Sequence, residues 1–165
     1  KRYFEVLPVR VSINNREVTS WDQPMVRPLQ EGLCALVCQV IDDKLFLILQ
    51  SKMECGNHDV IEFAPTIQTL TGDYKEVSAD KIPFLKYVLS APKDRVVLDT
   101  VQSEEGGRFY KEQNRNMVVL MLDNDFLTLP DNFHYCTLAD IADMLRFNNM
   151  LNIQVRNLIS TLNFV

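Results

Sequence analysis

The chain has 165 residues, a length typical of one domain, and we expect residues 1–165 to form a single unit. Hydrophobic residues make up 47% and charged residues 24% of the chain, values that exclude global disorder and low complexity. The formal net charge is −5 with no basic tail, so nonspecific binding to nucleic acid, which requires many cations against phosphate, is not expected.

Apolar runs and cysteines indicate the cellular setting. The longest apolar runs fall well short of the roughly 18 residues that a membrane-spanning helix needs, so we expect no membrane association. The four cysteines form no C-x-x-C pair and are interpreted as reduced, mostly buried thiols, which predicts a cytoplasmic protein. The start at Lys1-Arg2, without an initiator Met or a signal-peptide pattern, is typical of a trimmed or excised segment.

Two long apolar runs predict the centre of a β-sheet. Leu33–Ile41 and Lys44–Gln50 are rich in Leu, Val, Ile and Phe, and Asp42-Asp43 between them predicts a tight hairpin. Further strands are predicted at Val60–Phe63, Val96–Val101 and Met117–Leu122. About five strands are therefore expected.

Three helices are predicted between and after these strands. Pro83 suits the first turn of a helix that ends before Pro92. Thr137, three residues before Asp140, and Asn152 are N-cap candidates for two C-terminal helices with apolar stripes. The mixture of elements predicts an α+β (mixed α/β) domain in which helices flank a mixed sheet.

Three polar segments interrupt this apolar framework. The first, Trp21-Asp22-Gln23-Pro24, precedes the first core strand and is either a packed loop or a ligand-stacking surface. The second runs from Gln50 to Asn57, where strand alternation places Gln50, Lys52 and Glu54 on the face of Phe46 and Ile48. A solvated strand end is the alternative, although polar groups that emerge from buried surface carry a cost unless they are used.

The third segment joins Gln102-Ser103-Glu104-Glu105-Gly106-Gly107-Arg108-Phe109-Tyr110 to Asn114-Arg115-Asn116. Its carboxylates, arginines and Gly-Gly predict either a ligand loop that binds a diphosphate or a hairpin with surface ion pairs. His58 and His134 lie in no metal-ligand spacing, and no P-loop, dinucleotide or nucleophile-elbow motif is present. Acid/base chemistry by Lys, Glu and Tyr without a metal is therefore expected.

At these segments the chain resembles the NDP-hexose 2,3-dehydratase family. The resemblance also includes Arg2-Tyr3-Phe4, Ala64-Pro65-Thr66-Ile67-Gln68, Tyr74, Thr137-Leu138 and Asn152, and so covers essentially the whole chain. It implies a Nudix-like fold, no cofactor, and a lyase that removes water across C2 and C3 of a dTDP-4-keto-6-deoxyhexose. The alternatives are a non-catalytic sugar-nucleotide-binding or dimerisation module and a Nudix-type pyrophosphatase.

The chain departs from related patterns at three places. Gly56 and Glu62 fit the start of a Nudix box, but the carboxylates that should follow are absent between Leu70 and Glu76. Cys55 replaces the family's usual Pro, and Thr71-Gly72-Asp73 replaces an Arg. Family members carry two such repeats and this chain carries one, so we expect either a homodimer or a fragment of a longer protein.

The expected site combines the three polar segments. For proton transfer the candidates are Glu54, Glu105 and Tyr110, with Lys52 near the keto oxygen. Arg108 and Arg115 are expected at the diphosphate, and Trp21 is expected to stack on the base or sugar. Hydrogen bonds to the substrate are expected from Gln23, Gln50, Asn57, Gln68, Tyr74 and Asn114.

Overall fold

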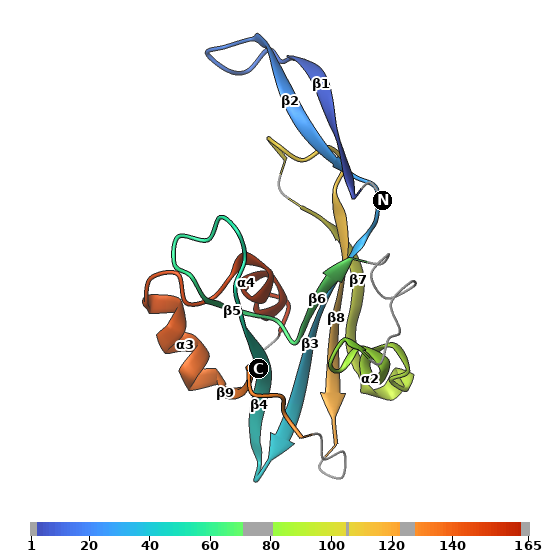
Figure 1. Ribbon diagram of the computed structural model, residues 1–165, viewed down its shortest axis with the longest axis vertical. Coiled ribbons are helices and arrows are strands. Elements are labelled where there is room, and N and C mark those ends of the chain that lie inside the picture. The colour runs from blue at the N-terminus through green and yellow to red at the C-terminus, as the bar shows by residue number, and fades with distance from the viewer. Residues whose placement is uncertain (1–2, 71–80, 105, 123–127, 163–165) are drawn as a thin grey trace.

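A computed structural model describes residues 3–70, 81–104, 106–122 and 128–162 (Figure 1). Its strands are β1 (Phe4–Ser12), β2 (Ser20–Pro28), β3 (Gly32–Ile41), β4 (Lys44–Lys52), β5 (Glu62–Ala64), β6 (Ile67–Leu70), β7 (Val96–Ser103), β8 (Gln113–Met121) and β9 (Phe133–Thr137). Its helices are α2 (Leu85–Leu89), a short 3-10 turn at Lys93–Arg95, α3 (Leu138–Arg146) and α4 (Ile153–Ile159).

The main sheet is mixed and has β3 at its centre. The strand order is β5-β4-β3-β8-β7, with β6 also paired to β3 and β9 to β4. β3 runs antiparallel to β4 and β6 and parallel to β8, and its first eight residues are all buried. The prediction of a central strand is confirmed, as is the hairpin, where Asp42 and Asp43 both adopt the positive φ of a tight two-residue turn.

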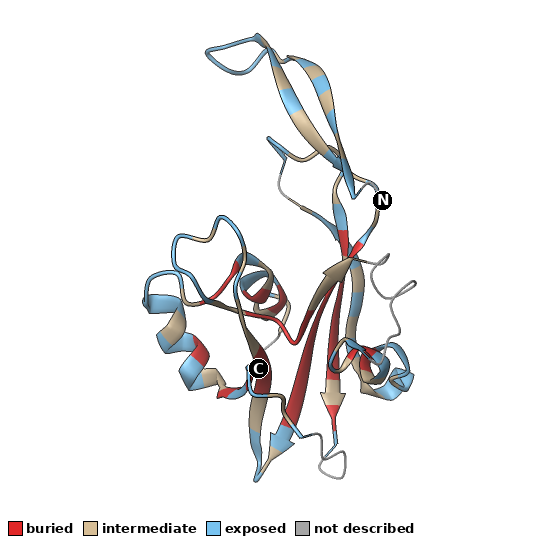
Figure 2. Ribbon diagram, in the orientation of Figure 1, coloured by how far each residue is buried: buried red, intermediate tan, exposed pale blue. Residues whose placement is uncertain are grey.

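Helices cover both faces of this sheet (Figures 1 and 2). On one face, Leu33 and Val37 of β3 pack in a core cluster with Leu85 and Val88 of α2. On the other, Leu36 packs in a second cluster with residues of α3 and α4. Side chains of a strand alternate between faces, so a run of buried residues in β3 supplies both cores at once.

Several predicted boundaries differ from the structure. The predicted strand Val60–Phe63 is wrong at its start, because β5 begins at Glu62 and Val60 is 75% exposed. The predicted first helical turn at Pro83 is also wrong, since α2 begins at Leu85 after Phe84, whose φ is +64°. Both C-terminal caps are confirmed: Thr137 and Asn152 accept backbone N–H groups at the starts of α3 and α4.

Four strands were missed: β1, β2, β6 and β9, so the expectation of about five strands was too low. β1 and β2 form a separate hairpin that extends away from the main sheet (Figure 1). Trp21 and Gln23 therefore lie on strand β2 and not in a packed loop. No residue of either strand is buried. Within the described residues, no helix has the length and apolar character needed to cross a membrane.

Candidate active site

The candidate site lies where β4 leaves its neighbour β3. β4 pairs with residues 37–41 of β3, and β6 takes over as the partner of residues 32–35. The buried hydroxyl of Thr66 joins the strands at this fork: its Oγ1 donates to Ile48 O at 2.5 Å and accepts from Val37 N at 2.8 Å. Beyond the fork a cleft of about 350 Å³ opens, with Cys34 and Gln154 among its lining residues.

On one side of the cleft, an ion pair between a lysine and a glutamate is held in place by side-chain amides. Lys52 Nζ lies 2.9 Å from Glu54 Oε1, and Gln68 Nε2 donates to the same oxygen at 3.0 Å. Gln68 is held in turn by Asn152, whose Nδ2 donates to Gln68 Oε1 at 2.8 Å. Because the Asn152 Oδ1 also accepts from Val155 N at the start of α4, the helix cap and the cleft wall share one side chain.

On the other side of β3, the cleft is lined at the start of β8 by Asn114 and by Glu112, which directly precedes that strand. Asn114 is only 9% exposed, and its Nδ2 donates to Glu104 Oε1 at 2.5 Å. Gly32 lies directly beside this amide, since a Cβ there would be 2.0 Å from Asn114 Oδ1. Glu112 also lines the cleft, and burial followed by the charge of Glu104 raises its pKa above the ordinary value.

The cleft brings together four of the residues expected in the site: Lys52, Glu54, Gln68 and Asn114. Alternation along one strand was the wrong reason for grouping the first two with Gln50. β4 ends at Lys52, Glu54 is held beyond it by contacts with Lys52 and Gln68, and Gln50 is not a lining residue. Asn57 follows nearby: its backbone N donates to Glu54 O at 3.3 Å, and its Nδ2 is buried without a partner among the described residues.

Other expected residues lie away from this cleft. Arg115 sits on the face of β8 opposite to Asn114 and makes two bonds of 2.7 Å to Asp99, which lower the pKa of that carboxyl. Arg108 is exposed and lies against Phe109, its guanidinium carbon 5.0 Å from the ring centre. The half-buried Tyr110 has Lys111 Nζ 5.5 Å from its own ring centre. Tyr74 and Glu105 lie outside the described residues, as does the segment on which the missing Nudix carboxylates were noted.

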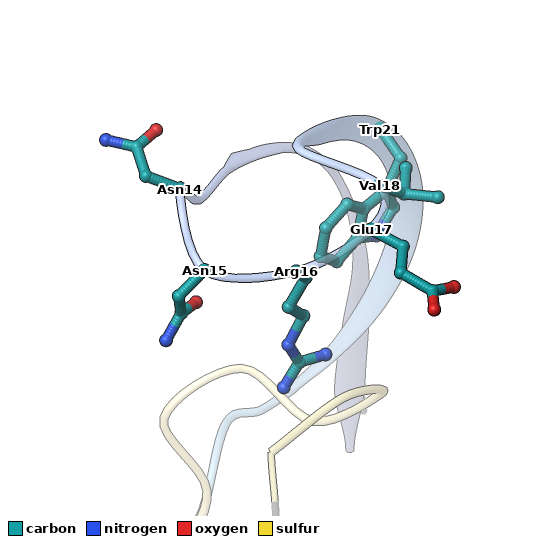
Figure 3. Close-up of a pocket in the computed structure, with 6 residues that line it drawn as sticks. All are labelled: Asn14, Asn15, Arg16, Glu17, Val18 and Trp21. Atoms are coloured by element: carbon teal, nitrogen blue, oxygen red, sulfur yellow. The ribbon is translucent and has the colours of Figure 1, made fainter.

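Trp21 and Gln23 belong to the hairpin. Trp21 Nε1 donates to Gln23 Oε1 at 2.6 Å, and Gln23 donates through Nε2 to the Gly107 carbonyl. Trp21 also lines a separate hollow of about 780 Å³ with the hairpin tip, residues 14–18 (Figure 3). The structure thus places four of the expected site residues in the cleft and two, Trp21 and Gln23, on the hairpin.

Residues that the sequence analysis did not assign to the site include Gly32, Glu104, Glu112 and Asn152. Glu104 lay within the third polar segment, but its neighbour Glu105 was chosen. The sequence held no local signal for this pair, because the β7–β8 register that places residues 104 and 112 opposite each other is centred on Arg108, whereas counting outward from Gly106-Gly107 pairs residue 104 with residue 109. No group of three or more His, Cys, Asp or Glu residues suited to a metal ion occurs in the part of the chain that the structure describes.

Two known proteins that share one description are similar in sequence to this chain. A dTDP-4-dehydro-6-deoxy-alpha-D-glucopyranose 2,3-dehydratase of Saccharopolyspora spinosa is 38% identical over 98% of this chain, and a protein of the same description from Streptomyces violaceoruber is 37% identical over 96%. The chain spans about a third of the length of these curated relatives, 33% and 35%.

Among solved structures, an ADP compounds hydrolase matches 96% of this chain and 91% of its own at a TM-score of 0.50 and 11% identity. That likeness concerns the fold alone, and the Nudix-like α+β fold is confirmed. The model of the family described as NDP-hexose 2,3-dehydratase matches residues 1–162. The chain therefore belongs to the NDP-hexose 2,3-dehydratase family.

Proposed function

We propose that this chain carries the substrate site of a dTDP-4-keto-6-deoxyhexose 2,3-dehydratase, a lyase of deoxysugar biosynthesis. The observation that carries the proposal is the pairing of Lys52 Nζ with Glu54 Oε1 at 2.9 Å on the wall of a polar cleft. The names of the relatives support the substrate class and the reaction.

The paired cation and carboxylate suit the first step of this elimination. The ketone at C4 acidifies the proton at C3, so a carboxylate can remove it if the charge that develops on O4 is stabilised. Glu54 is placed as the base and Lys52 as the group near O4. The amide of Gln68, which already donates to Glu54, holds the carboxylate in orientation.

The second step expels the hydroxyl at C2. The electron pair returns from O4, the C2–O bond breaks, and a double bond forms between C2 and C3. The departing oxygen needs a proton from an acid. The resulting enol tautomerises to a 3,4-diketo-2,6-dideoxy sugar nucleotide. Glu105 and Tyr110 stay predicted proton-transfer groups, and Trp21, Gln23, Gln50, Asn57, Tyr74, Arg108 and Arg115 stay predicted substrate ligands.

Incubation of the protein with dTDP-4-keto-6-deoxyglucose tests the reaction, with mass spectrometry of the sugar product for the loss of one water. We expect Lys52→Ala and Glu54→Gln to abolish turnover while the fold is kept. Lys44→Ala is the matched control, because Lys44 is exposed at the other end of β4. An intact substrate would contradict the proposal, and tight dTDP binding without turnover would indicate the non-catalytic module instead.

We also propose that two copies of the chain pair through the β1–β2 hairpin. A two-stranded sheet is only marginally stable in water by itself, and Phe4 and Val6 on this one are more than half exposed. Sedimentation should give a dimer at micromolar concentration, and Val6→Glu should shift it towards monomer. A wild-type monomer would contradict the pairing.

Two broader expectations belong to the same proposal. The four cysteines are free, which supports a cytoplasmic location. The family match over residues 1–162 supports our view of residues 1–165 as one unit.

A further inference from the structure

Two carboxylates, those of Glu104 and Glu112, face each other where β7 ends and β8 begins. The ladder pairs Gln102 with Asn114 and Ser103 with Gln113. The backbone N of Glu104 then donates to Glu112 O at 3.0 Å, which extends the same register by one residue. Direct partners in an antiparallel pair have Cβ atoms about 5 Å apart and side chains on the same side, so these two carboxylates are neighbours.

The two carboxylates differ in what holds them. Glu104 Oε1 accepts from Asn114 Nδ2, and Asn114 is itself buried against Gly32. Glu112 lines the cleft, and no hydrogen bond or ion pair of its carboxylate is found among the residues described. One member of the pair is therefore fixed, and the other is available to a ligand.

Charges around Glu112 favour its protonated form. Burial raises the pKa of Glu112, the neighbouring Glu104 raises it further, and Arg108 acts in the opposite direction. Across the cleft lie Lys52 and Glu54, which already pair with each other at 2.9 Å. A carboxyl group that holds its proton more tightly than usual is suited to act as a general acid.

We propose that Glu112 is the catalytic acid that protonates the C2 hydroxyl as it leaves, and that Glu104 and Asn114 are positioning residues for it. This inference rests on the proposed function. Glu112 lines the same cleft as Lys52 and Glu54 but precedes β8, whereas Glu54 is bonded to Gln68 of β6 on the other side of β3, so base and acid approach the sugar from two sides.

The protons balance over one turnover. Glu54 takes the proton from C3, and Glu112 gives its proton to the C2 oxygen, which leaves as water while the C2–O bond breaks. Glu54 is then protonated and Glu112 ionised. In the tautomerisation Glu54 returns a proton to C2 and Glu112 accepts the proton of the enol at O3, which restores both groups.

A change of leaving group separates an acid from a merely structural residue. Fluoride leaves without protonation, so an analogue with fluorine at C2 of the sugar does not need Glu112. We expect Glu112→Gln to lower kcat on the hydroxyl substrate on the order of 100-fold. On the 2-fluoro substrate the same variant should release fluoride at close to the wild-type rate, as measured with a fluoride electrode. Asp143→Asn, an exposed carboxylate on α3, is the control that should change neither rate.

The outcomes distinguish the inference from the proposed function. If the wild-type protein eliminates neither water nor fluoride, the proposed function fails and the inference with it. If the wild type eliminates both, an equal loss on the two substrates, or no loss, in Glu112→Gln overturns the role of Glu112 alone.

A second variant tests the pair if Glu112→Gln does not fold. Glu104→Gln removes the charge that raises the pKa of Glu112. The loss of activity at high pH should therefore begin at lower pH with the hydroxyl substrate, and the 2-fluoro substrate should show no such shift. An unchanged pH profile with the hydroxyl substrate would overturn the proposal.

Discussion

Gly32 gives the most direct test of how the cleft is built. An alanine there would place its Cβ 2.0 Å from Oδ1 and 2.9 Å from Cγ of Asn114. Since nonbonded heavy atoms prefer separations of about 3.5 Å, the amide must withdraw by more than about 1 Å. That movement breaks the bond of 2.5 Å from Asn114 Nδ2 to Glu104 Oε1.

A hydrogen bond to a charged group contributes about 1.5–3 kcal/mol. Gly32→Ala should therefore lower the free energy of unfolding by about 2 kcal/mol and Tm by roughly 4–8 °C for a chain of this size. Urea unfolding and thermal melting measure the two quantities. The backbone conformation at Gly32 permits alanine, because Gly32 lacks the positive φ of Gly56 and Gly107.

A double-mutant cycle isolates the cause. With Asn114→Ala in place, the nearest atom of residue 114 to the new Cβ is the Asn114 Cβ at 3.7 Å, an ordinary contact. Gly32→Ala should then cost nothing, or stabilise by about 0.4–1 kcal/mol, because alanine restricts the unfolded chain. An equal loss of about 2 kcal/mol in both backgrounds would refute the argument.

Three other predictions concern a helix cap, a carboxyl group and the thiols. Thr137→Ala should lower the free energy of unfolding by about 1 kcal/mol in a urea titration, because Thr137 Oγ1 caps Asp140 N at the start of α3; an unchanged midpoint would contradict the cap. Because the folded pKa of Glu112 is raised, its contribution to stability falls as pH rises above its ordinary value of 4.5. In urea unfolding, the free energy of unfolding of Glu112→Gln relative to wild type should therefore increase from pH 4.5 to pH 7.5. A decrease over this range would contradict the raised pKa. Burial raises the pKa of Cys34 to about 12, whereas Cys55 is exposed. Iodoacetamide at pH 8 should therefore alkylate Cys55 and spare Cys34 in the native protein, as measured by peptide mass spectrometry. Modification of both thiols at equal rates would contradict the burial of Cys34.

The sequence was most informative where one local signal determines the structure. Continuous apolar residues identify β3 as a central strand, and a short side-chain oxygen identifies the caps at Thr137 and Asn152. These signals depend on neighbours in the chain, so a pattern of a few residues is enough to detect them.

Tertiary pairing accounts for most of what was missed. Pro8 and Pro24 argue against strands, yet they are tolerated as partners in β1 and β2, because among the described residues the outer edge of β1 pairs with no further strand and that of β2 is bridged only at Val26. The ion pair between Arg115 and Asp99 was not predicted, because the two residues are far apart in the sequence and are brought together only by the β7–β8 ladder. The cleft itself depends on the fork at Thr66, which only the three-dimensional arrangement of β3, β4 and β6 creates.

The β1–β2 hairpin is hydrogen-bonded to the segment between Glu104 and Glu112. Val26 N donates to Arg108 O, and Tyr110 N donates to Val26 O, each at 2.7 Å. A few residues before and after this junction lie Glu104 and Glu112. If the proposed dimer forms through the hairpin, its interface would be joined through Val26 to the same stretch of backbone that connects Glu104 and Glu112, and dimerisation would be coupled to the proposed proton transfer.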